Sequence, residues 1–282
     1  MSAQEPQLIS DPSGPAPGLL ESKRRGGGGR PGFVWFVGAG PGDADLITLR
    51  GWRVLQKAEI VLHDSLVDPA LFEDLGAECV FVGKRCGEHS MSQEQIIELL
   101  IGLALQGKRV VRLKGGDPAV LGRLGEEALS VADAGIGFEV VPGVTSSTSV
   151  PELAGIPVTH RSLADSFVVA SAHRCAEGAE LSIPPYLART TLVLMMARAT
   201  ATEWQQQLLR EGYPPELPVA LISRGATEQQ RVVVTSVASA ATDLQAAGLE
   251  TPVLAVVGRV VSLRAHLASR PIDSAEERIH CQ

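Results

Sequence analysis

The sequence predicts an α/β protein made of two α/β domains that follow a separate N-terminal tail. Short apolar runs, typical of buried strands, alternate along the chain with stretches of helical spacing. Such alternation predicts a mostly parallel sheet with helices on both faces. Of the 282 residues, 45% are hydrophobic and 20% are charged, which is an ordinary globular composition with enough apolar surface for two cores.

Residues 1–32 form the expected tail. The segment is rich in proline, contains the run Arg24-Arg25-Gly26-Gly27-Gly28-Gly29-Arg30 and has few large apolar side chains. Burial therefore cannot offset the entropy lost on ordering, and we expect a flexible segment. A second, shorter tail is expected at 271–282.

The first α/β domain is expected over 33–158. Its apolar runs predict strands at Phe33–Val37, Glu59–His63, Cys79–Val82, Arg109–Leu113 and Phe138–Val141. Helical spacing predicts helices at Leu46–Lys57, Ser92–Gln106 and Gly125–Ala134. The second of these helices opens with a capping box, because Gln95 lies three residues after Ser92 and can bond back to it.

The second α/β domain is expected over 159–270, after Pro157 and neighbouring polar residues interrupt the pattern. Apolar runs predict strands at Phe167–Ala172, Thr191–Met196, Val219–Ser223, Arg231–Thr235 and Val253–Val257. Helices are expected at Thr202–Glu211 and Val237–Ala247. Because helices separate only some of these strands, we expect a mixed sheet.

Charge and cysteine content restrict the function. The net charge is −7 and no dense basic block occurs, which argues against nucleic-acid binding. The cysteines are far apart and form no C-x-x-C pair, so we expect neither a disulfide framework nor a metal site. No apolar run of about 18 residues is present to cross a membrane, and the N-terminus lacks a signal-peptide pattern. A cytoplasmic protein is expected.

Glycine-rich or polar loops follow the strands of the first domain. The expected carboxyl ends carry the segments 38–43, 83–90, 113–118 and 142–147, and Asp64 follows the second strand. Carboxyl ends of parallel strands lie at the same edge of a sheet, where ligands bind. One such loop is weak support for a site, but several at one edge predict a ligand cleft.

The first loop, Gly38-Ala39-Gly40-Pro41-Gly42-Asp43, also fits a second class of protein. A nicotinamide-dependent oxidoreductase would use it to bind a dinucleotide, with Asp64 as the acid that binds the ribose. Asp43 stands where the third glycine of that motif belongs, and Pro41 removes a backbone N–H. We therefore place this alternative second. Asp64 itself fits either a proton acceptor or a plain turn aspartate, and the turn is the more common role.

Seven strings occur in a fixed order over about Phe33–Arg264: VGAGPGD, HDSLV, VGKRCG, LKGGDP, VPGVTSS, AGIPVTHR and GATEQQRVV. Together they resemble the tetrapyrrole methylase family, and within it the methylases of uroporphyrinogen III. The resemblance implies two α/β domains with a cofactor cleft between them and a homodimer. It also implies S-adenosylmethionine as cofactor, S-adenosylhomocysteine as its product, and two methyl transfers that give precorrin-2. Methylation of a later corrin-pathway precorrin is the alternative within the family.

The resemblance assigns roles by position. Asp64 matches the family's proton acceptor and Lys84 its proton donor. Residues expected to bind S-adenosylmethionine are Pro41, Gly115, Gly116, Asp117, Val120, Thr145, Ser146, Met196 and Gly225. Expected partners for the carboxylates of the tetrapyrrole are Arg85, Arg112, Arg123, Arg161 and Arg198.

Several positions depart from the family pattern, and we expect them to line the cleft. They are Ala119, Leu124, Ser146-Ser147, Ala172 and Ala197-Arg198. We expect them to affect the exact substrate, the rate and the number of methyl transfers more than the class of reaction. They also leave a third alternative, a ligand-binding relative with a degraded site.

Overall fold

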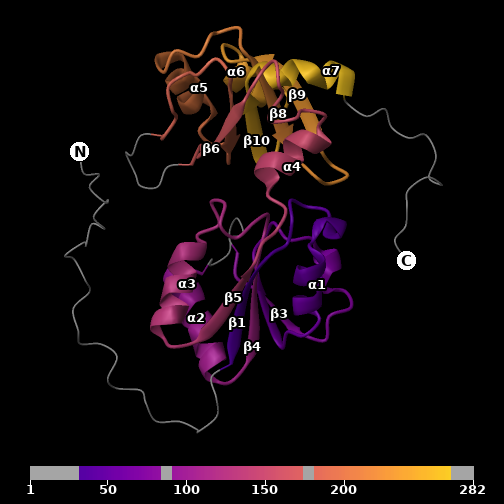
Figure 1. Cartoon of the computed structure of the whole chain (residues 1–282), viewed down its shortest axis with the longest axis vertical. Coiled ribbons are helices and arrows are strands. Elements are labelled where there is room, and N and C mark those ends of the chain that lie inside the picture. The colour runs from indigo at the N-terminus through magenta and orange to yellow at the C-terminus, as the bar shows by residue number, and fades with distance from the viewer. Residues whose placement is uncertain (1–31, 84–90, 174–180, 268–282) are drawn as a thin grey trace, which may run out of the picture. The chain divides into compact units, whose positions relative to one another are not determined.

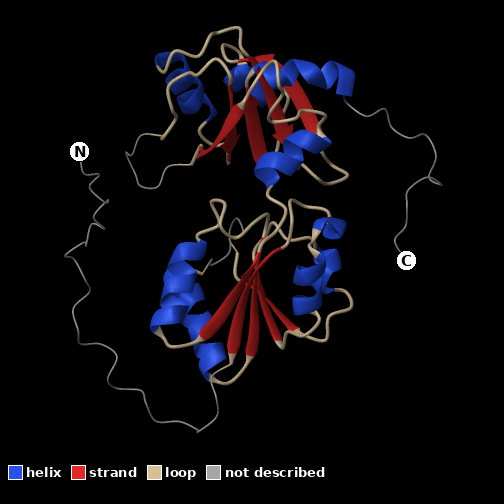
Figure 2. Cartoon of the chain, viewed as in Figure 1, coloured by secondary structure: helices blue, strands red, loops and turns tan. Residues whose placement is uncertain are grey.

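The computed structural model describes residues 32–83, 91–173 and 181–267 (Figure 1). The tails expected at 1–32 and 271–282 lie outside these ranges except for Gly32, as do Lys84 and Arg85. The described chain forms two sheets with associated helices, which confirms the predicted α/β class (Figure 2). No helix in the described ranges is long and apolar enough to cross a membrane.

The first sheet contains parallel strands in the order β3-β2-β4-β1-β5. Their bounds are β1 Phe33–Gly38, β2 Ile60–His63, β3 Glu78–Phe81, β4 Arg109–Lys114 and β5 Gly137–Val141. The predicted strands of this half are therefore confirmed. Since all of them are parallel, their carboxyl ends and the loops that follow lie at one edge.

Helices cover both faces of this sheet. On one face, α2 (Gln93–Leu105) and α3 (Leu124–Asp133) pack on strand residues that include Phe36, Leu62 and Val110. On the other face, α1 (Leu49–Leu55) and the 3₁₀ helix η2 (Pro69–Phe72) pack on residues that include Val61 and Val111. Figure 1 shows α1 on the opposite side of the strands from α2 and α3. The capping box predicted for α2 is confirmed, with Gln95 N–H donating to Ser92 Oγ at 3.3 Å.

The helix predicted over Leu46–Lys57 is divided into the 3₁₀ helix η1 (Ala44–Leu46) and α1. Two capping side chains explain the division. The Asp43 carboxylate accepts the N–H of Asp45 at 2.9 Å, and Thr48 Oγ1 accepts the N–H of Gly51 at 3.1 Å. Each cap starts its own helical segment, so helical spacing alone gives too long a helix here.

The second sheet has the order β6-β7-β10-β8-β9, in which β6 and β7 are parallel and the other pairs are antiparallel. The strand bounds are β6 Ser166–Ser171, β7 Thr190–Met195, β8 Pro218–Ser223, β9 Arg231–Ser236 and β10 Val253–Val257. The predicted mixed sheet is thus confirmed. Helices α5 (Ala201–Arg210) and α6 (Ala240–Ala246) cover one face, and η3 (Arg259–Leu263) lies on the other, before α7 (Arg264–Leu267).

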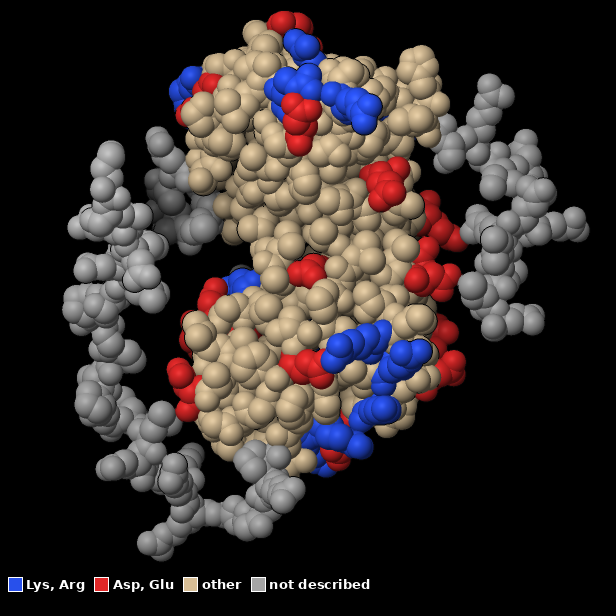
Figure 3. Space-filling model, in the orientation of Figure 1, with Lys and Arg blue, Asp and Glu red and all other residues tan. Residues whose placement is uncertain are grey.

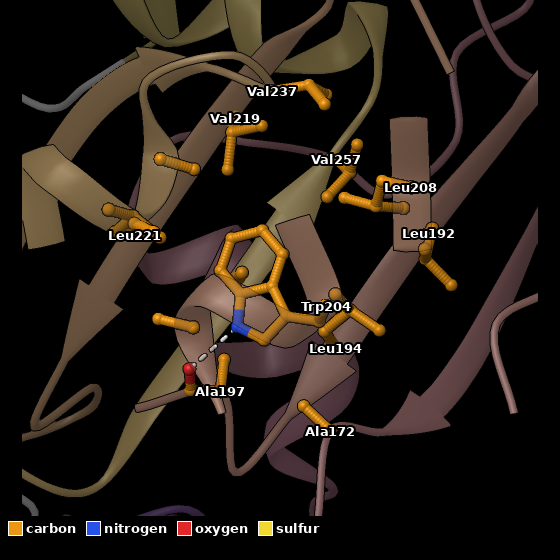
Figure 4. Close-up of a cluster of buried hydrophobic side chains, with 14 of the residues drawn as sticks. Ala172, Leu192, Leu194, Ala197, Trp204, Leu208, Val219, Leu221, Val237 and Val257 are labelled. Atoms are coloured by element: carbon orange, nitrogen blue, oxygen red, sulfur yellow. Dashed lines mark hydrogen bonds between the residues drawn. The ribbon is translucent and has the colours of Figure 1, made fainter. Parts of the chain in front are cut away.

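Trp204 of α5 is at the centre of the core between α5, α6 and the second sheet. Its side chain is fully buried among residues that include Leu194, Leu208 and Leu221 (Figure 4). The indole Nε1–H donates to the carbonyl oxygen of Ala197 at 2.8 Å. The hydrogen bond satisfies the one polar group that burial would otherwise leave unpaired.

A helix that was not predicted, α4 (Ser146–Leu153), joins the core on the opposite face of the second sheet. Its Val150 and Ala154, just beyond its end, pack with Ala220, Ile222 and other residues of that sheet. From the sequence we expected a polar loop after β5, with Thr145 and Ser146 as contacts of the cofactor. In the structure Thr145 also caps this helix.

Candidate functional site

The glycine-rich loops come together at the carboxyl edge of the first sheet. Gly40 and Gly116 form an isolated antiparallel bridge, in which Gly116 N–H donates to the Gly40 carbonyl oxygen at 2.6 Å. The loop after β1 and the loop after β4 are therefore tied backbone to backbone. Both glycines have positive φ angles, +87° and +68°, which side-chain-bearing residues rarely adopt.

Gly38 and Gly143 bring the loop after β5 to the same place. A β-carbon on Gly143 would lie 2.3 Å from the carbonyl oxygen of Gly116 and 2.7 Å from the Cα of Gly38. A β-carbon on Gly38 would lie 2.5 Å from the Cα of Gly143. The three backbones are therefore packed too closely for a side chain at Gly38 or Gly143.

Asp117 holds two of these loops together. Its Oδ1 accepts the N–H of Ala119 at 2.8 Å, and its Oδ2 accepts the N–H of Gly143 at 3.0 Å. Charge-assisted bonds of this kind are stronger than neutral ones. Both carboxylate oxygens thus bind backbone N–H groups of the protein. Asp117 therefore braces the loops after β4 and β5, whether or not it also contacts a ligand.

Asp64 has a similar arrangement after β2. Its Oδ1 accepts the N–H of Leu66 at 3.0 Å, which is the turn contact expected of a strand-end aspartate. Its Oδ2 accepts the N–H of Gly115 at 3.4 Å, which ties it to the loop after β4. The side chain is half-buried. Asp64 is therefore both a turn residue and a carboxylate at the glycine-lined edge.

Thr145 and Ser146 lie at the start of α4, beside the same edge. Thr145 Oγ1 lies 3.0 Å from Ser147 Oγ, and a β-carbon on Gly116 would lie 3.8 Å from the backbone nitrogen of Ser146. The structure thus brings Gly116 and Ser146 together, as the sequence interpretation requires. Pro41 and Val120 follow the glycines of their loops and are half-buried.

Residues 224–226 of the second domain lie close to the first glycine loop. A β-carbon on Gly42 would lie 2.8 Å from the carbonyl oxygen of Ala226, and one on Gly225 would lie 2.3 Å from Val150 Cγ1. The neighbours of Gly225, Arg224 and Ala226, have positive φ angles of 48° and 61°. Such strained backbone is typical of functional sites.

Met196 directly follows β7. Its φ angle is 59° and its side chain is 46% exposed. Met196 thus contributes little to the core, and its backbone has a conformation that side-chain-bearing residues rarely adopt.

The arginines predicted to bind substrate have different environments. Arg112 is buried: its guanidinium donates to Glu127 Oε1 at 3.4 Å and to the carbonyl oxygens of Leu62 and Leu113 at 3.3 and 3.1 Å. A substrate carboxylate would have to displace these partners. The assignment of Arg112 to substrate binding is therefore corrected, and Arg112 is a structural residue.

Arg123 and Arg161 are both exposed. Arg123 Nε donates to Glu126 Oε1 at 3.0 Å across one turn. Arg198 donates through Nε to the carbonyl oxygen of Leu249 at 2.8 Å, which directs at least that group into the second domain. On the face drawn in Figure 3, groups of basic side chains have acidic side chains beside them. That face is therefore not uniformly basic.

A cluster of buried charges, which the sequence did not reveal, lies between β4 and α3. Lys114 Nζ donates to Glu127 Oε1 at 2.9 Å, and both side chains are almost inaccessible. Burial lowers the pKa of Lys114 and so does the Arg112 charge, whereas Glu127 and Asp64 act in the opposite direction. Glu127 is thus the counter-ion of two buried cations. The available signal was the pair of cations two residues apart in β4, each next to the apolar Leu113.

The geometry disfavours the dinucleotide alternative. In a dinucleotide-binding loop the glycines lead directly into a helix, whose N-terminus faces the pyrophosphate. Here η1 intervenes, and α1 begins only at Leu49. In the six-stranded order of that fold β1 lies between β2 and β4, whereas here its neighbours are β4 and β5.

A parallel sheet with a glycine-lined carboxyl edge, followed by a mixed sheet, defines a two-domain α/β protein with a candidate site for a small molecule at that edge. The profile of the tetrapyrrole (corrin/porphyrin) methylases matches residues 34–241. The chain belongs to this family, and the predicted membership is confirmed.

Relatives and solved structures agree with this assignment. A sirohaem synthase of Azotobacter vinelandii (strain DJ / ATCC BAA-1303) is 43% identical over 266 residues, which cover 93% of this chain and 57% of the relative. The chain spans about half the length of the curated relatives it matches. The crystal structure of uroporphyrin-III-C-methyltransferase from Thermus thermophilus has a TM-score of 0.72 at 43% identity, covering 85% of this chain and 97% of that one. A Thermus thermophilus structure complexed with S-adenosylhomocysteine has a TM-score of 0.70 at 38% identity, covering 82% and 93%.

Proposed function

We propose that this chain is a methyltransferase that moves methyl groups from S-adenosylmethionine to carbon atoms of uroporphyrinogen III. Two successive transfers give precorrin-2 and two molecules of S-adenosylhomocysteine. The observation that carries the proposal is the similarity to uroporphyrin-III-C-methyltransferase over 97% of that enzyme's length. The glycine-lined edge of the first sheet is the proposed site of this reaction.

The residues at this edge fit the cofactor. The closely packed glycine backbones leave this edge without bulky side chains, so that a ligand could approach the main chain directly. Residues proposed to hold it are Pro41, Gly115, Gly116, Asp117, Val120, Thr145, Ser146, Met196 and Gly225. When bound, the cofactor supplies an electrophilic methyl group that its own sulfonium activates.

The side chains of this protein position the substrate and receive a proton. A pyrrole β-carbon that gains a methyl group leaves the ring positively charged, and loss of the ring N–H proton restores neutrality. The Asp64 carboxylate is the proposed acceptor, because it lies at the edge and is held there by Leu66 and Gly115. Lys84 is the proposed proton donor. Orientation of the two reactants accounts for much of the expected acceleration.

Candidate partners for the carboxylates of the substrate are Arg85, Arg123, Arg161 and Arg198. Lys84 and Arg85 lie outside the described residues, and Arg198 has one guanidinium nitrogen engaged already. Arg123 and Arg161 are thus the described side chains best able to reach an incoming polyanion. We also propose that the protein acts in the cytoplasm and as a homodimer.

Mass spectrometry of uroporphyrinogen III incubated anaerobically with the protein and S-adenosylmethionine tests the proposal. Two added methyl groups are expected. No added methyl group, with S-adenosylhomocysteine still bound in calorimetry, would favour a later precorrin as substrate. Binding of NADH without binding of S-adenosylhomocysteine would refute the methyltransferase and support the oxidoreductase alternative.

A further inference from the structure

Arg161 differs from the other described arginines that are proposed to meet the substrate. Arg123 is paired with Glu126, and Arg198 donates to the carbonyl oxygen of Leu249. Within residues 32–83, 91–173 and 181–267, the exposed Arg161 guanidinium makes no hydrogen bond or ion pair. Its long side chain and its loop both lose conformational freedom on binding an anion, so whatever fixes its backbone affects binding.

Arg161 lies at the tip of a tight turn, 160–164, between α4 and β6. His160 and Ala164 form an isolated antiparallel bridge, in which the backbone N–H of each donates to the carbonyl oxygen of the other at 2.9 Å. Ala164 is buried, and Leu163 packs against the same apolar cluster. The base of the turn is therefore anchored in the core, whereas its tip is exposed.

The core beneath this turn also supports the glycine-lined edge. Ala164 shares its apolar cluster with Val150 and Ala226. A β-carbon on Gly225 would lie 2.3 Å from Val150 Cγ1, and one on Gly42 would lie 2.8 Å from the carbonyl oxygen of Ala226. The turn is thus built on the same core as the loops of the candidate site.

Arg189, directly before β7, holds the tip of the turn. Its Nη2 donates to the carbonyl oxygen of Arg161 at 2.8 Å, and its Nη1 donates to that of Ser162 at 3.4 Å. Its Nε and Nη2 also donate to the two carboxylate oxygens of Asp165. The planar fork of one guanidinium therefore binds both the tip of the turn and the residue that follows it.

The strand register brings Arg189 to this place. Strand β6 pairs with β7 in parallel, with Ser166 opposite Thr190. The two side-chain hydroxyls of this pair lie 2.7 Å apart. One residue earlier, the Asp165 N–H donates to the carbonyl oxygen of Arg189 at 2.9 Å. The backbone of Arg189 is thus fixed by the sheet, and only its side chain reaches over to the turn.

Stability is a poor explanation for this arrangement. The side chains of Arg189 and Asp165 are 51% and 59% exposed. Solvent and salt screen a pair as exposed as this one, so it contributes little to the free energy of unfolding. The hydrogen bonds to the two carbonyl oxygens instead restrict the main chain at Arg161 and Ser162.

We propose that Arg189 is a positioning residue, which fixes the main chain at Arg161 so that the Arg161 guanidinium is directed to a carboxylate of the tetrapyrrole. The inference rests on the proposed function of Arg161 in substrate binding. Each guanidinium nitrogen of Arg189 already donates within the protein, so Arg189 acts through Arg161 and not on the substrate. A turn that is ordered before binding lowers the entropy cost of binding.

The test is a double-mutant cycle on KM for uroporphyrinogen III. Arg161→Ala should raise KM about tenfold or more, the value of one charge-assisted hydrogen bond. Arg189→Ala should raise KM about threefold to tenfold, the usual cost of ordering one such side chain. The kcat and the affinity for S-adenosylhomocysteine should not change. The double variant should have the KM of Arg161→Ala alone, because Arg189 then has nothing to position.

Arg50→Ala is the matched control for the loss of positive charge. Arg50 forms a surface pair with Glu139, and its removal should leave KM at the wild-type value. Arg189→Lys keeps the charge but lacks the planar fork, so its KM should stay raised. If Arg189→Ala does not fold, Asp165→Asn loosens the same contacts and should raise KM in the same direction.

A wild-type KM in folded Arg189→Ala, or equal factors for Arg189→Ala with and without Arg161, would overturn this inference alone. A lower stability of Arg189→Ala with no change in KM would show that the contacts are only structural. A wild-type KM in Arg161→Ala would remove Arg161 from substrate binding and the inference with it. Absence of methyl transfer in the wild-type protein would overturn the proposed function as well.

Discussion

Substitution of Gly143 by alanine tests whether the close approach of three backbones forms the cofactor site. The new β-carbon would lie 2.3 Å from the carbonyl oxygen of Gly116. A close carbon–oxygen contact is about 3.3 Å, so the loops after β4 and β5 must separate by roughly 1 Å. Such overpacking typically costs about 1–3 kcal/mol of unfolding free energy. A displacement of about that size at a reacting centre can cost on the order of a hundredfold in rate.

Calorimetry measures the affinity for S-adenosylhomocysteine, and denaturant unfolding measures the free energy of unfolding. We expect Gly143→Ala to lower both affinity and stability. Gly102→Ala is the matched control, because Gly102 lies inside α2 and its β-carbon would have no neighbour within 4 Å. That control should gain about 0.5–1 kcal/mol of stability and leave binding unchanged. Wild-type affinity in Gly143→Ala would refute the idea that the backbone contact shapes the site.

Further predictions concern the residues that hold the site and its core. Asp117→Asn should lose about 1.5–3 kcal/mol of stability in urea unfolding, because an amide cannot accept both N–H groups. Weaker binding of S-adenosylhomocysteine without a loss of stability would contradict the bracing role of Asp117. Glu127→Leu leaves Arg112 and Lys114 without their counter-ion and should cost about 3–5 kcal/mol of stability. An unchanged free energy of unfolding in the same urea assay would show that the two cations do not need Glu127. Trp204→Ala should cost about 3–5 kcal/mol of stability. A change in unfolding free energy no larger than that of a surface substitution would contradict this expectation. The lowered pKa of Lys114 means that the native state binds fewer protons there than the unfolded state does. The stability contribution of this group is therefore complete above the unfolded pKa and is lost as the pH falls through the native one. Relative to Lys114→Met, the wild-type protein should gain stability as the pH rises towards about 10, and a constant difference would contradict this sign.

Strand positions were predictable because buried parallel strands are continuous apolar runs, whose ends polar or glycine residues mark clearly. Helix α4 was not, since its sequence from Ser146 is rich in serine and contains Pro151. It is stabilised by packing of Val150 and Ala154 on the second sheet. Tertiary contacts outweigh weak local propensity in such a segment, and no local pattern reports them.

The candidate site also has a part that the sequence predicts and a part that only the structure shows. Loops at strand ends can be located from the sequence, because the carboxyl edge follows from a parallel sheet. The alternation of Arg112 and Lys114 in β4 marks a shared face, but it does not tell whether that face meets solvent or a helix. Only the packing of α3, which brings Glu127 over β4, shows that both cations are buried. A pairing over such a sequence separation depends on the fold as a whole.

Positions that depart from the family pattern differ in what they touch. Ala197 is buried and its carbonyl oxygen accepts the indole N–H of Trp204. Ala172 is also buried, and its carbonyl oxygen accepts a hydrogen bond from Thr200. Ser147 is buried against Thr145. These departures were expected to line the cleft, but they belong to the interior around it.

Ala119 and Leu124 are different, because both line a hollow of about 600 Å³ beside α3 that also contains Leu121 and Arg123. Leu121 is 46% exposed, and Arg123 is a proposed partner of the substrate carboxylates. A small residue at 119 widens this apolar hollow, whereas a leucine at 124 fills part of it. Since Ala172, Ala197 and Ser147 alter packing, any difference in substrate choice or in the number of methyl transfers should follow from Ala119 and Leu124, together with Ser146 and Arg198.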